Sequence, residues 1–321
     1  MVLPEVTATV ADRIHIAGLA YSVAAGDGSV WVATSENDRG RGAVVHIDPA
    51  GDRVVATVRI DGFAYNLAVG DGAAWVPVYV QGKGNRLLRI DAGTNEVTGR
   101  VVGVTGPVVV DATGVWAIQG EPSERDWAVV QIDPSTLAIG RRVPVSDAPF
   151  DMAAGTGSIW ALVTHRCLGG NRCFGPLLHI DASTGVAASV DFSNAGILIA
   201  ADDAGVWLSA WDPSRPNQAV AAFVSASTNA LSGRPVGISN FRPFAVADGR
   251  AWFIAGPGTP GPGICGLNVL TREVDACVRL RSIADLEGAH DPAAFEPNTD
   301  SIWIGEYEAP LVTRIDVTVG S

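Results

Sequence analysis

The sequence has no long hydrophobic run, few cysteines and few basic residues. No apolar stretch reaches the roughly 18–20 residues that a membrane-spanning helix needs, and Met1-Val-Leu-Pro4 leads straight into a polar segment without a signal-peptide core. The 22 Lys and Arg residues against 34 Asp and Glu give a net charge of −12, which repels phosphate backbones. We therefore expect no transmembrane segment and no nucleic-acid partner. The chain is then either cytosolic or a mature chain whose export signal has been removed.

Several catalytic motifs are also missing. The sequence contains no Gly-x-Ser-x-Gly nucleophile elbow and no phosphate-binding Gly-x-x-x-x-Gly-Lys-Ser/Thr loop. Its Asp-Gly steps stand between strand-like runs, where they read as tight turns, and no Asp-x-Asp-x-Asp calcium loop occurs. These absences argue against serine hydrolases of that type and against P-loop enzymes.

Seven tryptophans recur along the chain at intervals of 41 to 51 residues. A period of about 40–50 residues built from short strands is typical of a β-propeller, in which each repeat forms one four-stranded blade. Because a large apolar residue at one repeated position suits a core shared between blades, we expect these tryptophans to pack rather than to bind a ligand. They are Trp31, Trp75, Trp116, Trp160, Trp207, Trp252 and Trp303.

The residues around each tryptophan repeat as well. Gly-Asp-Gly or a similar turn precedes it, and Arg-Ile-Asp or His-Ile-Asp closes a later strand. The segment Val6 to Val10 copies the outer strand Val54 to Val58, so the N-terminal strand is expected to complete the last blade. The sequence predicts an all-β, seven-bladed propeller of four-stranded antiparallel blades, with residues 1–321 forming a single domain.

The four cysteines form two local pairs. Cys265 and Cys277 flank a predicted hairpin, and Cys167 and Cys173 bracket a short loop, so we predict the disulfides Cys167–Cys173 and Cys265–Cys277. Zinc binding is the competing interpretation, although neither spacing matches a familiar zinc motif. Two disulfides indicate an oxidising compartment, hence a secreted or surface-anchored protein.

The connections between the second and third strands, and between successive blades, are long and variable, whereas the other connections are short. Variable loops on a rigid scaffold commonly carry function, so we place the site on this loop-rich face, at the mouth of the central channel. An aromatic concavity with a few polar groups is typical of a small-molecule site. The residues expected to bind the ligand are Tyr21, Tyr65, Tyr79, Gln119, Asp151, Trp211, Arg242, Asp291 and Tyr307.

The Gly-Asp-Gly-x-x-Trp, Arg-Ile-Asp-Pro and Val-Val-Ala-Thr pattern resembles the bacterial YncE-like and virginiamycin B lyase-like propellers over essentially the whole chain. The resemblance to the lyase implies metal-assisted opening of a cyclic depsipeptide by elimination. It would place catalytic residues at His290, Glu287 and Glu306, with Glu287 and Glu306 holding a divalent cation, Mg²⁺ or Ca²⁺. The family's Glu-x-His appears here as Glu287-Gly-Ala-His290.

Three classes of function stay open. The first is a ligand-binding or sensor module for a small molecule or peptide, the second a metal-dependent lyase, and the third a protein-interaction platform. In the simplest non-catalytic interpretation, Glu306 and Arg242 form an ion pair at the channel mouth and His290 is only hydrogen-bonded. His46 and His179 stand where sibling repeats have Arg89 and Gln131, so we expect them on blade faces. We expect the chain to be a monomer.

Overall fold

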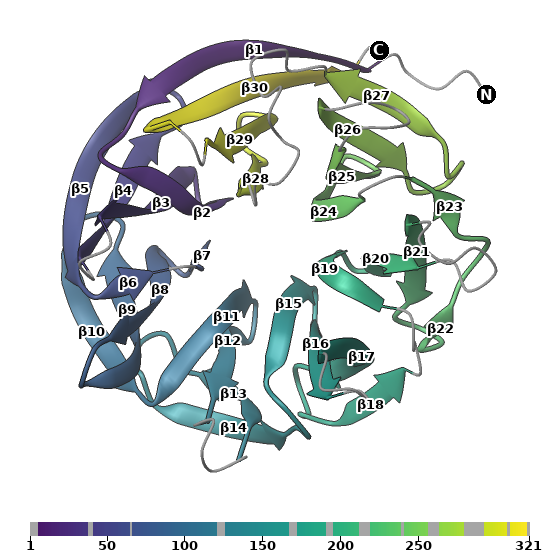
Figure 1. Cartoon of the computed structure of the whole chain (residues 1–321), viewed down its shortest axis with the longest axis horizontal. Helices are drawn as coiled ribbons and strands as arrows, with labels where there is room; N and C mark the ends of the chain where they lie inside the picture. Colours follow the sequence, from purple (N-terminus) through teal and green to yellow (C-terminus); the bar gives the residue numbers. More distant parts are fainter. Residues whose placement is uncertain are drawn as a thin grey trace.

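The computed structural model describes residues 6–37, 41–64, 66–120, 126–166, 172–190, 195–211, 219–238, 241–255, 263–278, 292–306 and 309–319. Within these ranges the chain forms strands in seven antiparallel sheets and no helix. The sheets stand around a ring with their first strands at the centre (Figure 1). The predicted seven-bladed propeller is confirmed. The described residues include no helix that could cross a membrane.

The first four blades run from the innermost to the outermost strand in chain order. Blade 1 contains β2 (Leu19–Gly26), β3 (Ser29–Asn37), β4 (Arg41–Asp48) and β5 (Arg53–Asp61). Blade 2 contains β6 (Phe63–Ala64), β7 (Ala68–Gly70), β8 (Ala73–Val80), β9 (Gly84–Asp91) and β10 (Val97–Val102). Blade 3 contains β11 (Val104–Asp111), β12 (Gly114–Gln119), β13 (Ala128–Ile132) and β14 (Ile139–Pro144). Blade 4 contains β15 (Pro149–Gly155), β16 (Ser158–Arg166), β17 (Arg172–Asp181) and β18 (Ala187–Val190).

The last three blades follow the same order, except that blade 7 takes a strand from the start of the chain. Blade 5 contains β19 (Ala195–Ala201), β20 (Gly205–Trp211), β21 (Ala219–Ser225), β22 (Ala230–Leu231) and β23 (Val236–Gly237). Blade 6 contains β24 (Arg242–Ala247), β25 (Arg250–Ala255), β26 (Gly263–Asn268) and β27 (Val274–Val278). Blade 7 contains β28 (Ala293–Glu296), β29 (Ser301–Gly305), β30 (Leu311–Val319) and β1 (Val6–His15).

The two ends of the chain pair with each other. Strand β1 lies antiparallel to β30 from Val6 opposite Val319 to His15 opposite Leu311, with one irregularity between Val10 and Asp12. It lies on the outside of blade 7 (Figure 1). The N-terminal strand therefore completes the last blade, as the sequence predicted, and β30 has no unpaired edge.

The hydrophobic core lies between blades. All seven repeat tryptophans are at most 1% exposed. Trp31 of blade 1, for example, shares a buried cluster with Val76 and Ile90 of blade 2. Burying a large aromatic side chain contributes about 2–3 kcal/mol, so each interface gains from one repeated residue.

A side chain from the neighbouring strand covers the tryptophan in most blades. His46, directly opposite Trp31, stacks on it with ring centroids 4.1 Å apart, and His179 stacks on Trp160 at 4.2 Å. Arg314 lies over Trp303 in the same position. The two histidines are thus on blade faces, as expected from the repeat.

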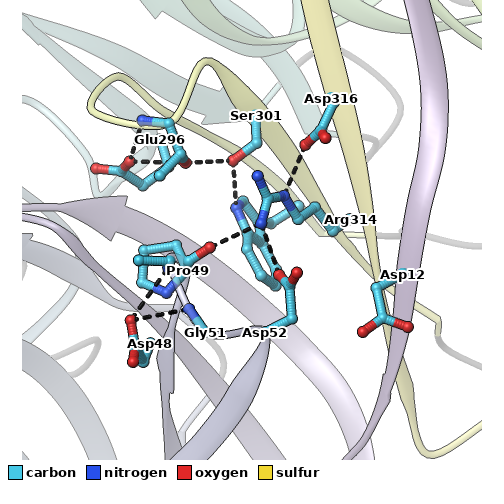
Figure 2. Close-up of polar contacts among 12 residues, drawn as sticks. Asp12, Asp48, Pro49, Gly51, Asp52, Glu296, Ser301, Arg314 and Asp316 are labelled. Atoms are coloured by element: carbon cyan, nitrogen blue, oxygen red, sulfur yellow. Dashed lines mark hydrogen bonds and ion pairs between the residues drawn. The ribbon is translucent and has the colours of Figure 1, made fainter.

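The next blade then holds this covering side chain in place. Asn95, in the turn of blade 2 with φ of 59°, has its Oδ1 2.7 Å from Nδ1 of His46. At the ring closure Arg314 of blade 7 donates to Asp52 Oδ1 at 2.7 Å and to the Pro49 carbonyl at 2.8 Å, both in blade 1 (Figure 2). Asp316 accepts from the same guanidinium at 2.7 Å. Each such contact fixes one blade against the next.

The repeated Ile-Asp motif is explained by the turn that follows it. Asp133 Oδ1 accepts from the backbone N–H groups of Ser135 and Thr136, both at 2.8 Å, and also from the Ser135 hydroxyl. These hydrogen bonds lower the pKa of Asp133 to about 2, and the bond from the Ser135 hydroxyl has the largest effect. The carboxylate therefore caps the turn between the third and fourth strands.

One of the two predicted disulfides lies in the described residues. Cys265 and Cys277 face each other in register on β26 and β27 and are joined by a disulfide, with their Cα atoms 4.1 Å apart. This confirms the predicted hairpin and its bridge. Cys167 lies outside the described residues, so the Cys167–Cys173 pairing stays a prediction.

Candidate functional site

The centre of the ring holds a cavity of about 510 Å³. Its wall is built from the innermost strands of all seven blades, and the residue opposite each repeat tryptophan belongs to it. That residue is alanine in six blades and valine in one: Ala24, Ala68, Val109, Ala153, Ala200, Ala245 and Ala294. Small side chains at this position keep the channel open while the tryptophans fill the space between blades.

Two of the described residues that line the cavity carry a charge, Asp151 and Arg242. Both lie near the beginning of an inner strand, β15 and β24, and hence on the side of the ring where successive blades are connected. This is the loop-rich side predicted to carry the site. Most of the other lining residues have apolar side chains, and polar atoms, largely of the backbone, make up a comparable share of the cavity surface. Apolar side chains with a few polar groups are common in small-molecule pockets.

Asp151 also links two blades. Its Oδ1 accepts from the backbone N–H of Met152 at 2.9 Å, and its Oδ2 accepts from the N–H of Ile199 in blade 5, also at 2.9 Å. Burial raises the pKa of the Asp151 carboxyl to about 7, and the two backbone donors only partly offset this effect. A carboxyl in this state changes charge near neutral pH.

Asn66 occupies the same repeat position in blade 2. Asn66 lies two residues before Ala68, which is opposite Trp75. Asp151 lies two residues before Ala153, which is opposite Trp160. Asn66 Oδ1 accepts from the N–H of Val108 in blade 3 at 3.0 Å, as Asp151 does from Ile199. Asn66 was missing from the residues expected from the sequence. Aligning the repeats on their tryptophans would have found it.

Tyr21 lines the cavity from blade 1, whereas Tyr79 does not line it. The ring of Tyr21 meets Phe63 edge to face, with centroids 4.9 Å apart. Phe63 pairs across β6 and β8 with Tyr79, whose residue surface is 49% exposed. Tyr21 therefore faces the channel, whereas Tyr79 lies on the neighbouring blade opposite Phe63 and is exposed.

Gln119 and Glu306 do not line the cavity either. Gln119, at the end of β12, accepts from Arg142 Nε at 3.3 Å, and Arg142 also pairs with Asp126 at 2.7 Å. Glu306, just after β29, accepts from the Thr313 hydroxyl at 2.7 Å. Both side chains are engaged at the rims of their own blades.

The remaining predicted site residues lie where side chains are not described. Trp211 ends β20, opposite Ala219, but its side chain is outside the described part. Tyr65, Glu287, His290, Asp291 and Tyr307 lie outside the described residues altogether. Among the residues described, no three or more His, Cys, Asp or Glu side chains are arranged to hold a metal ion.

The opposite end of the channel is acidic. A second cavity of about 340 Å³ is lined there by Asp111, Asp202 and Asp203. Burial, with further contributions from the neighbouring charges of Asp27 and Asp111, raises the pKa of Asp71. Carboxylates at this mouth give the channel a negative potential that favours cations.

Comparison with known proteins identifies the fold. No protein-family model and no curated protein sequence matches the chain. It is similar in structure to the WD40 domain of Toxoplasma gondii coronin, with a TM-score of 0.70, 8% identity, and coverage of 100% of this chain and 88% of that one. It is also similar to Kuenenia stuttgartiensis hydrazine synthase, with a TM-score of 0.67, 12% identity, and coverage of 97% and 98%.

A third similar structure is the β-propeller domain of the Trilobed protease from Pyrococcus furiosus, described as having an open velcro topology. Its TM-score is 0.61 at 9% identity, covering 89% of this chain and 91% of that one. At such low identities these likenesses establish the propeller fold and carry no information on activity.

Proposed function

We propose that this chain is an exported ligand-binding or sensor module that takes a small molecule or peptide at the loop-rich mouth of its central channel. The observation that supports this proposal is the cavity of about 510 Å³ at the centre of the ring. Pockets of about 300–1,000 Å³ with apolar walls and a few polar groups are typical of small-molecule sites. Asp151 and Arg242 are the charged residues among the described part of the lining.

The disulfide between Cys265 and Cys277 supports export. Disulfides persist in oxidising compartments and are rare in the cytosol. Recovery of the protein from culture medium or periplasm with this bridge intact would support the location, and a reduced protein found only in the cytosol would contradict it.

A paired substitution tests the proposed site. Tyr21→Ala removes an aromatic side chain from the wall of the cavity, whereas Tyr79→Ala removes an exposed tyrosine outside it. A compound library is screened against the wild type by ligand-observed NMR, and each hit is titrated into both variants. A channel site is supported by hits whose affinity falls at least tenfold in Tyr21→Ala and less than twofold in Tyr79→Ala. The absence of any hit, or equal losses in the two variants, would contradict it.

A metal-dependent lyase resembling virginiamycin B lyase is the second candidate. It depends on Glu306, whose carboxylate accepts from the Thr313 hydroxyl, together with His290 and Glu287, which lie outside the described residues. A cation bound only by the folded state raises the melting temperature. Stabilisation by Mg²⁺, Mn²⁺ or Ca²⁺ that is lost in Glu306→Gln would support the lyase, and identical melts in EDTA and in each metal would argue against it.

A further inference from the structure

Asp151 places a carboxyl in the channel wall without a cationic partner among the described residues. Its two oxygens each accept one backbone N–H, from Met152 and from Ile199. A carboxylate offers about four acceptor sites, so two stay available. The residue is partly accessible and belongs to the lining of the cavity, so these sites can be reached from the channel.

The link between blades does not need this charge. Asn66, at the same repeat position, makes the equivalent bond to the next blade with a neutral amide oxygen, at 3.0 Å. A partly buried carboxylate without a cationic partner is less well stabilised than one in water, and a counter-charge offsets this cost. Blade 4 therefore carries an ionisable group where the architecture alone would accept asparagine.

Among the side chains that the structure describes, the strands packed on β15 supply no such counter-charge. Strand β19 carries no ionisable residue, and β11 carries only Asp111, at its far end. Strand β16 carries His165 and Arg166, whose side chains lie outside the described part. Arg242 lines the same cavity from β24, two blades away.

We propose that the ligand of this channel is an organic amine, and that its ammonium group pairs with the Asp151 carboxylate while its apolar body lies against the alanine and valine wall. This inference rests on the proposed ligand-binding function and names its ligand class. An ammonium donates three hydrogen bonds and supplies the positive charge that the Asp151 carboxylate lacks among its described neighbours. The acidic opposite mouth of the channel, with Asp111, Asp202 and Asp203, adds to the attraction for a cation.

The test uses two probes that differ only at the polar group, 2-phenylethylamine and 2-phenylethanol. Both are titrated at millimolar concentration into the wild type and Asp151→Asn, which reproduces the residue found at the Asn66 position. We expect the amine to bind the wild type at least tenfold more tightly than the alcohol, and Asp151→Asn to remove that preference. Equal binding of the two probes, or an amine preference that survives in Asp151→Asn, would overturn the proposal.

A titration of the unmodified protein keeps the test independent of the variant's folding. The carbon-13 shift of the Asp151 carboxyl is followed against pH with and without the amine. Because binding requires the ionised carboxylate, the amine should lower the pKa of Asp151 from its value of about 7, and its affinity should fall about tenfold for each pH unit below that value. An unchanged titration in the presence of saturating amine would overturn the proposal.

The result also separates this inference from the broader function. If neither probe binds while an uncharged library compound binds the channel, the amine class is wrong and the binding function stands. If neither the probes nor any library compound binds, both are wrong.

Discussion

Asn95 of blade 2 holds the imidazole of His46 against Trp31 of blade 1, with 2.7 Å between Oδ1 and Nδ1. Because the amide oxygen can only accept, His46 carries its proton on Nδ1, and Nε2 accepts from the Ser29 hydroxyl at 3.2 Å. The two residues are 49 positions apart in the chain. This contact is one of the repeated links that fix a blade against its neighbour.

Removing this link should loosen the interface between blades 1 and 2. Asn95→Gly keeps the left-handed backbone, φ of 59°, without strain but leaves Nδ1 of His46 without its acceptor. We expect a loss of about 1–2 kcal/mol in the free energy of unfolding, measured by urea denaturation. Glu96→Ala, at the exposed neighbouring residue, is the control and should change the free energy of unfolding little. Equal losses in the two variants would contradict a stabilising link between Asn95 and His46.

The same histidine should make stability depend on pH. Burial lowers the pKa of His46 below 6.5, so the unfolded chain takes up a proton at a pH where the folded chain does not. The contribution of the neutral ring is complete above pH 6.5 and is lost as the pH falls below that value. His46→Gln introduces the residue type that blade 3 has at the same repeat position, Gln131. It should reduce the dependence of the unfolding free energy on pH between pH 5 and 7.5. An unchanged dependence would contradict this role of His46.

Asp151 should act in the opposite direction. Its carboxyl has a pKa of about 7 in the folded protein against 3.8 in the unfolded chain, so the folded state binds the additional proton between these values. Stability is greatest below pH 3.8 for this group and falls as the pH rises to about 7, by about 2–4 kcal/mol. Asp151→Asn should lose this dependence. Comparing its unfolding with that of the wild type at several pH values isolates the effect from that of His46.

Closure of the ring should depend on the first strand. Deleting residues 1–16 removes β1 together with the buried side chains of Ile14 and Ile16 and exposes the edge of β30. We expect a loss of about 3–6 kcal/mol and association through the free edge, seen in thermal melts and size-exclusion chromatography. Deleting only residues 1–5, which precede β1, is the matched control; similar behaviour of the two deletions would show that β1 does not close the ring.

The described disulfide should stabilise blade 6. Cys265 and Cys277 are 12 residues apart, and closing a loop of this size contributes about 3 kcal/mol in the chain-entropy model. The double substitution Cys265→Ser with Cys277→Ser should lower the melting temperature of the oxidised protein. If dithiothreitol lowers the melting temperature of this variant further, the second predicted pair is supported. A non-reducing digest should then contain Cys167 and Cys173 joined in one species. A variant that melts like the wild type would contradict a stabilising role for the first.

The residues that recur in each repeat predicted the architecture. The seven tryptophans, the Ile-Asp turns and the match between residues 6–10 and 54–58 predicted the blades and the closure by β1, because each repeat must place the same residue types in the same local positions. The pairing of Cys265 with Cys277 followed from a single hairpin. Such features depend on short-range geometry, which a sequence specifies directly.

The site was predicted less completely. Tyr21, Asp151 and Arg242 line the cavity, whereas Tyr79, Gln119 and Glu306 lie at blade rims. All six stand near strand ends, and an irregularity such as the one between Pro149 and Asp151 decides which residue turns inward. The period of the repeat does not show where such irregularities fall.

The fold, the number of blades, the closure of the ring and the negative charge could all be predicted from the residues alone, since they follow from repeated local patterns and composition. The folded ring was needed to show that Asp151 links blade 4 to blade 5 while keeping acceptor sites toward the channel. It was also needed to show that Asn66 links blades 2 and 3 in the same way without a charge. A carboxyl's partners and burial depend on residues more than 40 positions away in the chain, and these come together only when neighbouring blades pack.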